Sequence, residues 1–321
     1  MSIYIIILHY SPSKELQDYT VNLTLASLKS VINSNYKNLK IILIDNSENL
    51  NFPVEKLEEL GKESIVLIKN KKNTGFAEGC NIGIKMALKN NADYIFLLNN
   101  DAIVYESMFD EFLKYAEDEK VDILGGKIYY ADNLITPLTP PLSRGEDMNV
   151  GLSMDRAILW YAGGKIDWLR GRGVHIGQDI PDNEEFDTVM ETDFVTGCAI
   201  FIKRKVFETI GLLDEKYFLY FEDVDFCVRA KKAGFKIKYI PSAKIEHIVS
   251  ATTKKESPLS IYYQNRNRLI FMRTHTSIFN VIVFFILYFL GFIRRIVIAL
   301  LKKDNEKFEA NIKAFIDGLI R

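Results

Sequence analysis

Apolar positions divide the N-terminal part of the chain into short buried strands that alternate with helices. Residues 3–8 form an almost continuous β-branched run, and segments 39–45, 65–68 and 94–98 repeat this pattern. Such unbroken apolar runs are typical of parallel strands that helices cover on both faces. Residues 18–34 carry apolar side chains at a helical spacing. The pattern predicts an α/β protein with a Rossmann-like, mostly parallel central sheet flanked by helices.

Polar residues follow the ends of these predicted strands. His9 and Tyr10 begin the turn after the first strand, Asp45 closes the second, Asn73 follows the third, and Asp101 follows the fourth in LLNNDAIV. Open α/β sheets bind ligands beyond the carboxyl ends of their strands, so we expect Asp45, Asn73 and Asp101 to share one pocket. Taken alone, each aspartate is equally well interpreted as a turn residue.

Two glycines lie where the third strand gives way to a helix that we expect to end near Lys89. Gly75 and Gly79, in NTGFAEGCN, would let a diphosphate approach the backbone at the helix start. The segment is neither a GxGxxG motif nor a Walker loop, so on its own it is a weak signal for phosphate binding.

A second helix start, in FEDVDFCVR, carries Glu222, Asp223 and Asp225. Unpaired backbone N–H groups at a helix N-terminus favour an ionised carboxylate there, which suits a general base at Asp223. Helix capping explains an isolated acidic cluster better, and we expect capping for Asp225. Arg229 lies four residues after Asp225, a spacing that predicts an ion pair between them.

Composition narrows the functional class. The chain has 41 Lys and Arg against 42 Asp and Glu, so its formal net charge of −1 gives no general attraction to nucleic acid. Cys80, Cys198 and Cys227 lie outside zinc-binding or CxxC spacings, which indicates reduced, buried thiols in a cytosolic protein. The first strand has no basic segment before it, so we do not expect a cleaved signal peptide.

Several motifs occur in a fixed order over roughly residues 3–275: NTGFAEGCNIGI, LLNNDA, TGCAIFIKRKVFETIGLLDEKYFLYFEDVDFCVRAKKAGFKIKYIPSAKIEH and YYQNRNRL. In this order they resemble glycosyltransferase family 2, particularly its rhamnosyltransferase-like members. The resemblance implies a GT-A fold and a metal-dependent, inverting transfer from a nucleotide-activated sugar. The donor would be dTDP-rhamnose or a UDP- or GDP-sugar. The acceptor would be a saccharide or lipid-linked hydroxyl in cell-surface polysaccharide synthesis.

The resemblance also implies residue roles. Asp45 would contact the nucleobase, Asp223 would be the catalytic base, and Asp101 would bind Mn²⁺ or Mg²⁺. Asn99 replaces the first acidic residue of a DxD motif, so Asp101 is its only charged ligand; His247 is the candidate second ligand, with simple packing as an equal alternative. The other candidate donor- or acceptor-binding residues are His9, Tyr10, Asn73, Gly75, Asn81, Asn99, Asn100, Glu222 and Arg266.

The middle of the chain departs from strand and helix patterns. Residues 131–156 contain three of the eight prolines and no periodic apolar face, which predicts a flexible surface insertion. Residues 163–187 are expected to form a glycine-rich polar loop, and strand patterning resumes in VMETDFVTGCAIFI. There Gly197 would allow the backbone to approach substrate, or form a plain bulge.

The C-terminal segment changes composition sharply. Residues 278–293 are apolar but fall short of the ~20 residues that normally span a bilayer. We therefore expect a catalytic domain over 1–275 and a helical tail over 276–321 that associates with the cytoplasmic face of the inner (cell) membrane. The basic residues that would meet anionic headgroups are Arg266, Arg268, Arg273, Arg294, Arg295, Lys302 and Lys303.

Two other classes compete with a glycosyltransferase. A sugar-nucleotide nucleotidyltransferase would carry a basic glycine-rich loop after Leu8, and the sequence has none there. A noncatalytic, membrane-associated binding module would retain nucleotide binding but show neither donor hydrolysis nor transfer. Neither alternative accounts for the ordered motifs.

Overall fold

The computed structural model describes residues 1–61, 65–131, 157–248 and 257–320. The insertion predicted over 131–156 therefore lies, apart from its first residue, outside the described residues. The strands are β1 (Ile3–His9), β2 (Leu39–Asp45), β3 (Ile65–Lys69), β4 (Tyr94–Asn99), β5 (Ala102–Val104), β6 (Ile123–Tyr130), β7 (Leu159–Tyr161), β8 (Gly164–Asp167), β9 (Arg172–His175), β10 (Met190–Glu191), β11 (Ala199–Lys203) and β12 (Ile237–His247). The helices are α1 (Lys14–Ile32), α2 (Glu55–Glu58), α3 (Gly75–Lys89), α4 (Met108–Asp118), α5 (Arg204–Ile210), α6 (Glu222–Lys232), α7 (Pro258–His275), α8 (Ile278–Leu301) and α9 (Asn305–Ile320).

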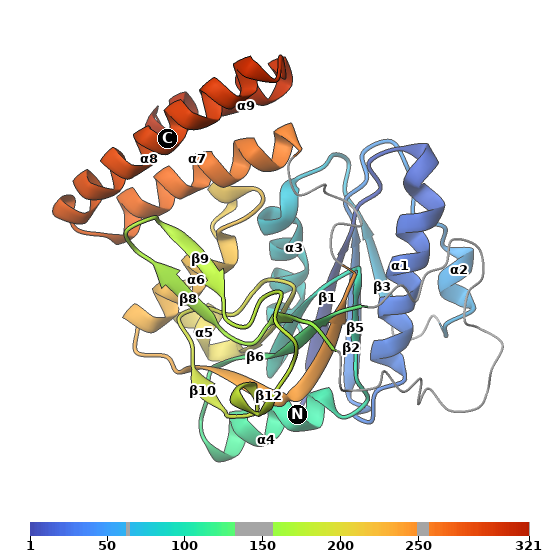
Figure 1. Cartoon of the computed structure of the whole chain (residues 1–321). Helices are drawn as coiled ribbons and strands as arrows, with labels where there is room; N and C mark the ends of the chain where they lie inside the picture. Colours follow the sequence, from blue (N-terminus) through green and yellow to red (C-terminus); the bar gives the residue numbers. More distant parts are fainter. Residues whose placement is uncertain (62–64, 132–156, 249–256, 321) are drawn as a thin grey trace.

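The N-terminal half has the predicted parallel arrangement. Strands β3, β2, β1 and β4 pair in that order and in one direction, and α1 and α3 lie on opposite sides of the sheet (Figure 1). The four apolar runs of the sequence coincide with these strands, and residues such as Ile5, Leu43 and Phe96 are fully buried. The α/β fold prediction is therefore confirmed, because strands covered on both faces need apolar side chains at nearly every position.

The second half of the sheet mixes directions. In the described residues the ten-stranded sheet has the order β10-β12-β6-β11-β4-β1-β2-β3, with β5 paired to β12 and β7 to β6. Strand β11 is antiparallel to β4 and β6, whereas β12 runs parallel to β6. As a result, the end of β4, the start of β11 and the end of β12 all lie at one edge of the sheet.

The region predicted as a glycine-rich loop contains a β-hairpin instead. Strands β8 and β9 pair antiparallel, with Gly164 opposite His175. A Cβ on Gly164 would lie 2.5 Å from the Phe194 ring, and one on Gly173 would lie 2.9 Å from it. The glycines thus allow the hairpin to lie flat on Phe194. The loop prediction was wrong for two reasons. Glycines lower the strand propensity of a segment, and the sequence does not show that these glycines pack against Phe194.

The three C-terminal helices form one packed layer (Figure 1). Helix α9 packs against α7, where Leu269 fills the space beside Gly318, and against α8, where Phe292 and Phe315 stack at 4.7 Å. Helix α8 has 24 residues, a mean hydropathy of 2.4 over its most apolar window, and only 11% of that window buried. The helix is thus longer than the sixteen apolar residues predicted for it. By length and composition it is able to cross a membrane.

Candidate active site

The ends of four strands bring the predicted polar residues to one edge of the sheet. In the strand registers His9 lies beside Asp45, and Leu8 lies beside Asn99. Strand β11 begins opposite Leu98 at the same edge. The sequence therefore placed these residues correctly, because carboxyl ends of parallel strands always share an edge.

Asp101 and His247 face each other beyond this edge. Their Oδ1 and Nε2 atoms are 3.1 Å apart, and both side chains are buried. Antiparallel pairing of β5 with β12 sets His247 opposite Ala102, and the N–H of Ile248 donates to the carbonyl of Asp101 at 2.9 Å. Burial lowers the pKa of His247, but Cys198 and the Asp101 carboxylate raise it to about 10. The 3.1 Å contact therefore ties the imidazole of His247 to the Asp101 carboxylate.

These two side chains fit a divalent cation that a substrate also holds. The Nδ1 atom of His247 is buried without a hydrogen-bond partner in the described part of the chain. No group of three or more His, Cys, Asp or Glu side chains among the described residues is arranged to hold a metal. Carboxylate and imidazole are suitable ligands for Mn²⁺, and Mg²⁺ commonly takes one or two carboxylates together with substrate phosphates.

Asp223 lies in the first turn of α6 and is pinned by backbone donors. The N–H of Gly197 donates to its Oδ2 at 2.7 Å, and the N–H of Val224 donates to its Oδ1 at 2.8 Å. Burial raises the pKa of Asp223, and these hydrogen bonds reduce the rise without cancelling it. The side chain is only partly buried. A carboxylate with a raised pKa and access to solvent suits a general base.

Glu222 stands beside Asp223 but is fully enclosed. Its Oε2 has no partner among the residues that the structure describes. Burial, and then the charge of Asp223, raise the pKa of Glu222 well above its usual range. Of the two carboxylates, Asp223 is the one that its surroundings favour in the charged form, because backbone N–H groups donate to it.

The turn at Gly197 and Cys198 joins the two parts of the site. Gly197 binds Asp223 as described, and the carbonyl of Cys198 accepts a hydrogen bond from the N–H of Asn99 at 2.8 Å. Asn99 lies two residues before Asp101. The close approach predicted for Gly197 is therefore to Asp223, whose Cβ would lie 3.5 Å from a Cβ at this glycine.

The segment that leads into Asp223, residues 217–221, has an unusual backbone and is called the strained segment below. Phe218, Tyr220 and Phe221 have φ angles of 63°, 67° and 77°, in the left-handed region that side chains disfavour. The carbonyl of Phe218 accepts a hydrogen bond from the N–H of Phe76, at the start of α3, at 2.6 Å. Such strain commonly clusters at functional sites, where surrounding contacts hold it in place.

Helix α7 supplies those contacts. The side-chain amide of Asn267 donates to three carbonyls of the strained segment, those of Tyr217, Leu219 and Tyr220, at 2.9, 2.8 and 2.7 Å. The ring of Tyr263 stacks on Phe218 at 4.8 Å. These groups fix the backbone immediately before Asp223 from one side.

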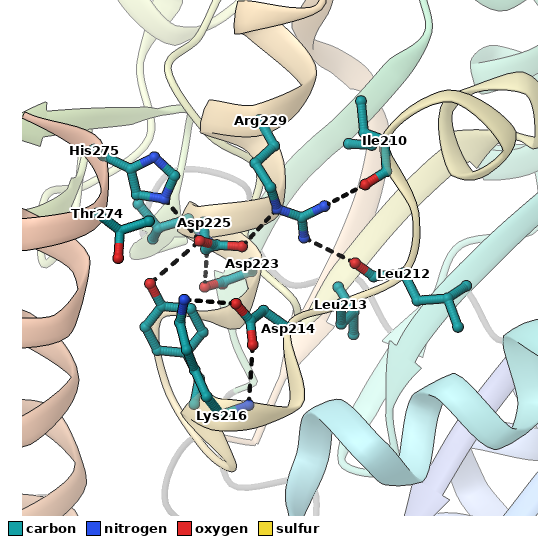
Figure 2. Close-up of polar contacts among 12 residues, drawn as sticks. Ile210, Leu212, Leu213, Asp214, Lys216, Asp223, Asp225, Arg229, Thr274 and His275 are labelled. Carbon is teal, nitrogen blue, oxygen red and sulfur yellow. Dashed lines mark hydrogen bonds and ion pairs between the residues drawn. The ribbon is translucent and has the colours of Figure 1, made fainter. Parts of the chain in front are cut away.

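Asp225 ties the same helix to α6 (Figure 2). Its Oδ1 lies 2.7 Å from Nε2 of His275 at the end of α7, and its Oδ2 accepts from Nε of Arg229 at 2.8 Å. Burial raises the pKa of Asp225, but His275 and Arg229 bring it below its usual value. The predicted Asp225–Arg229 pair is confirmed, while the capping role was wrong because both carboxylate oxygens face these partners.

Comparison with known proteins settles the family. A sequence model described as glycosyltransferase like family 2 matches residues 20–271. The chain belongs to this family. The dTDP-rhamnosyl transferase RfbF of Shigella flexneri is 23% identical over 99% of this chain and 95% of its own length. The rhamnosyltransferase WbbL of Escherichia coli (strain K12) is 24% identical over 54% of this chain and 60% of its own.

Further similarities support the same assignment. An N-acetylglucosaminyl-diphospho-decaprenol L-rhamnosyltransferase of Mycobacterium tuberculosis is 31% identical over 26% of this chain and 27% of its own. GalNAc-T7, crystallised with UDP, GalNAc and Mn²⁺, superposes with a TM-score of 0.57 at 16% identity, covering 82% of this chain and 48% of the other. The corresponding values for S. aureus TarS 1-349 are 0.50, 12%, 89% and 71%. The chain is thus a nucleotide-sugar glycosyltransferase with a GT-A fold, similar to rhamnosyltransferases, and the two competing classes are not supported.

One nucleotide-binding candidate of this glycosyltransferase, Asp45, is already engaged with the protein. Asp45 accepts from the N–H groups of Ser47 and Phe52 at 3.0 and 2.8 Å, and from the ammonium of Lys69 at 3.0 Å. The aspartate thereby orders the loop after β2, and its contact with a nucleobase remains a prediction. Tyr10, half-buried at the end of β1, also remains a candidate.

His9 does not offer a free ring nitrogen. Its Nδ1 lies 2.8 Å from the Thr24 hydroxyl, and its Nε2 lies 2.9 Å from the Ser11 hydroxyl. Burial lowers the pKa of His9 to about 4, so the ring is neutral at neutral pH. These contacts make His9 a support for the strand end, and its predicted substrate contact stays a prediction.

Gly75, Asn81 and Arg266 likewise have contacts within the protein, and their substrate contacts stay predictions. Gly75 has a φ of 79°, and a Cβ at this position would lie 2.5 Å from the Phe218 carbonyl, so Phe218 packs directly against this glycine. The Asn81 amide pairs with both the N–H and the carbonyl of Leu213, at 3.1 and 2.9 Å. The Arg266 guanidinium donates to backbone carbonyls at the start of the strained segment.

Two asparagines were missed as site-building residues. Asn46 donates to the Asn73 side chain at 2.9 Å and accepts from Asn70 at 2.9 Å, and thereby holds the turn before α3. Asn100, which the sequence had already marked as a candidate, donates to the hydroxyl of Thr24 at 3.0 Å. The second missed residue, Asn267, lay in the quoted motif YYQNRNRL, where the neighbouring arginines drew the functional interpretation.

We expect Asn267→Ala to lower glycosyl transfer strongly, because the carbonyls of Leu219 and Tyr220 lose their side-chain donor and Asp223 loses its fixed position. The free energy of unfolding should fall by about 1–3 kcal/mol, the usual cost of buried polar groups left unpaired. Gln264→Ala, on the exposed side of the same helix, is the matched control and should leave both quantities near wild type. Wild-type activity in Asn267→Ala would contradict the bracing role.

Proposed function

We propose that the enzyme transfers a sugar from a nucleoside-diphosphate donor with inversion at the anomeric carbon, using Asp223 as the base. The observation that carries this proposal is the position of Asp223. It is held by the N–H of Gly197 and is partly open to solvent, and burial raises its pKa beside the enclosed Glu222. The same turn connects it to the strand end that carries Asp101.

In the proposed reaction the acceptor hydroxyl oxygen attacks the anomeric carbon from the face opposite the leaving group. Its proton passes to the carboxylate of Asp223 while the bond from the anomeric carbon to the diphosphate oxygen breaks and its electron pair leaves with the diphosphate. General-base assistance of this kind typically contributes ~10²–10⁴ in rate. The Gly197 N–H keeps the carboxylate aimed in one direction during the transfer.

Asp101 and His247 would hold Mn²⁺ or Mg²⁺ together with the donor diphosphate. When bound, the metal would neutralise charge that develops on the leaving diphosphate. The contribution of the chain is to keep the carboxylate and the imidazole within 3.1 Å of each other at the end of β4. The crystallised fold neighbour with Mn²⁺ is consistent with this choice.

For the donor we propose dTDP-rhamnose, and for the acceptor a lipid-linked saccharide of a cell-surface polysaccharide. The first rests on the similarity to RfbF over nearly the whole chain, and the second on the shorter similarity to a rhamnosyltransferase named for a diphospho-decaprenol acceptor. Candidates for donor contacts among the described residues include Asp45, Tyr10, Asn73, Asn99 and Asn100.

We further propose that α8 docks on the cytoplasmic face of the membrane. An interfacial helix buries an apolar face at the headgroup boundary, and exposed apolar residues on this scale otherwise favour aggregation. The exposed large apolar residues of α8 are Ile278, Phe279, Ile282, Ile286, Leu287, Phe289, Leu290, Ile293, Val297, Ile298, Leu300 and Leu301.

Asp223→Asn should lower kcat by ~10²–10⁴, because an amide cannot accept the proton. Transfer is measured with purified enzyme and nucleotide sugar, and the product's anomeric configuration is read by NMR. Asp110→Asn, an exposed carboxylate in the first turn of α4, is the control and should retain activity. Near wild-type activity of Asp223→Asn, or a retained anomeric configuration, would rule out the proposed mechanism.

Asp101→Asn and His247→Ala should each weaken Mn²⁺ binding at least about tenfold, a loss of about 1.4 kcal/mol. Calorimetric titration of Mn²⁺ in the presence of nucleoside diphosphate measures this affinity. Glu246→Gln changes the neighbouring residue on the opposite face of β12, where the carboxylate accepts from the Tyr105 hydroxyl, and should leave the affinity unchanged. Unchanged affinity in His247→Ala would remove this histidine from the site.

Replacing Ile286 and Leu290, which are 59% and 60% exposed, by glutamate should reduce binding to phospholipid vesicles at least about tenfold. Vesicle sedimentation gives the bound fraction. Val66→Glu, at a 48% exposed position on strand β3, serves as the control and should not change it. Wild-type protein that stays entirely in the supernatant without detergent would exclude the docking role.

A further inference from the structure

Two arginines share one tyrosine ring where the C-terminal helices meet. The guanidinium carbon of Arg268, on α7, lies 5.5 Å from the ring centre of Tyr288. That of Arg295, on α8, lies 5.3 Å from the same centre. Stacking on aromatic rings orients guanidinium groups, but it does not cancel their mutual repulsion.

Neither charge is neutralised within the described part of the chain. Arg268 donates through Nε to the carbonyl of Arg170, and Arg295 donates through Nε to the side chain of Asn311 at 2.9 Å. Both partners are uncharged groups. The Nη2 atom of Arg295 is buried without any partner among the described residues. A buried donor in this state carries a free-energy cost that an anion would remove.

The pKa of Arg268 reflects the same excess of positive charge. Burial, and next the charge of Arg295, lower the pKa of Arg268 to about 10. The carboxylate that acts on it, Asp167, is held more closely by Arg170, with an ion pair of 3.0 Å. Asp167 lies 3.9 Å from Arg172, so a third guanidinium with an exposed side chain adds to the positive charge here.

The arginines lie between the proposed membrane surface and the active site. At the tip of the β8–β9 hairpin, Trp168 stacks on Phe271 of α7 at 5.6 Å, and Gly171 fits closely against Met272 and Phe284. Further along the same hairpin, a Cβ at Gly173 would lie 3.3 Å from Val224, which follows Asp223. Figure 1 shows the hairpin reaching from α6 to the layer of α7 and α8.

We propose that Arg268 and Arg295, with Arg172 beside them, bind a phosphate group carried by a lipid. This inference rests on the proposed function, because it assumes that α8 lies at a membrane. Planar guanidinium groups match phosphate oxygens with paired hydrogen bonds. The apolar residues exposed along α8 would meet the hydrocarbon part of the same molecule. The phosphate belongs either to a lipid-linked acceptor or to an anionic phospholipid.

The test is a calorimetric titration of the full chain in nonionic micelles, with EDTA present so that metal-dependent donor binding does not contribute. Farnesyl diphosphate and a short-chain phosphatidylglycerol are the probes, and wild type should bind at least one of them. Arg295→Gln should weaken binding about tenfold, as expected for the loss of a charge-assisted hydrogen bond. Arg295→Lys, which keeps the charge, should restore part of it.

Two controls separate a site from general charge and from packing. Arg294→Gln removes the neighbouring exposed arginine and should change the affinity less than twofold. Asn311→Ala breaks the contact with Arg295 but leaves the charge, so it should also bind nearly as wild type does. Equal losses in Arg294→Gln and Arg295→Gln, or a loss in Asn311→Ala as large as in Arg295→Gln, would overturn the proposal.

The two phosphate sources give different results. Tighter binding of the diphosphate identifies the acceptor lipid, and tighter binding of phosphatidylglycerol identifies a headgroup site. Wild-type protein that binds neither probe would refute the site. Donor hydrolysis and sugar transfer, measured on the same preparations, report on the proposed function separately. An enzyme that transfers sugar but binds neither probe would retain that function and lose the lipid-phosphate site.

Discussion

The left-handed backbone at residues 218–221 is the constraint on which the active site depends. Each non-glycine residue in this conformation costs about 1–2 kcal/mol, so three of them need compensating contacts. Asn267 supplies three hydrogen bonds to carbonyls of this region, and Phe218 in turn accepts from the start of α3. The resulting turn delivers Asp223 to the N–H of Gly197.

Helix α7 consequently belongs to two parts of the molecule. One side of it holds the strained segment and, through His275, the Asp225–Arg229 pair of α6 (Figure 2). Another side packs against α9, which also contacts α8. The boundary predicted after residue 275 therefore falls between helices that pack together, and that division remains a prediction. Helix α7 thus contacts both the C-terminal helices and the backbone before Asp223.

The metal and base candidates come together for a different reason. Strands β5 and β12 pair so that Asp101 meets His247, and the start of β11 brings Gly197 and Cys198 beside the end of β4. These contacts join residues more than a hundred positions apart through backbone pairing alone. In this sheet the site therefore forms where strands of opposite direction pair. Backbone pairing, more than contacts among the charged side chains, sets the positions of these side chains.

The sequence by itself determined the parallel strands, the edge at which Asp45, Asn99 and Asp101 lie, and the family. Continuous apolar runs identify buried strands, and the carboxyl ends of parallel strands meet at one edge whatever the loops do. Only the tertiary structure decided which polar residues are already used by the protein. His9, Asn81 and Arg266 have partners in other segments, and the partner of Asn81 is 132 positions away. The β8–β9 hairpin, the role of Asn267 and the uncompensated Arg268–Arg295 pair depend on similar long-range packing, which local spacing does not encode.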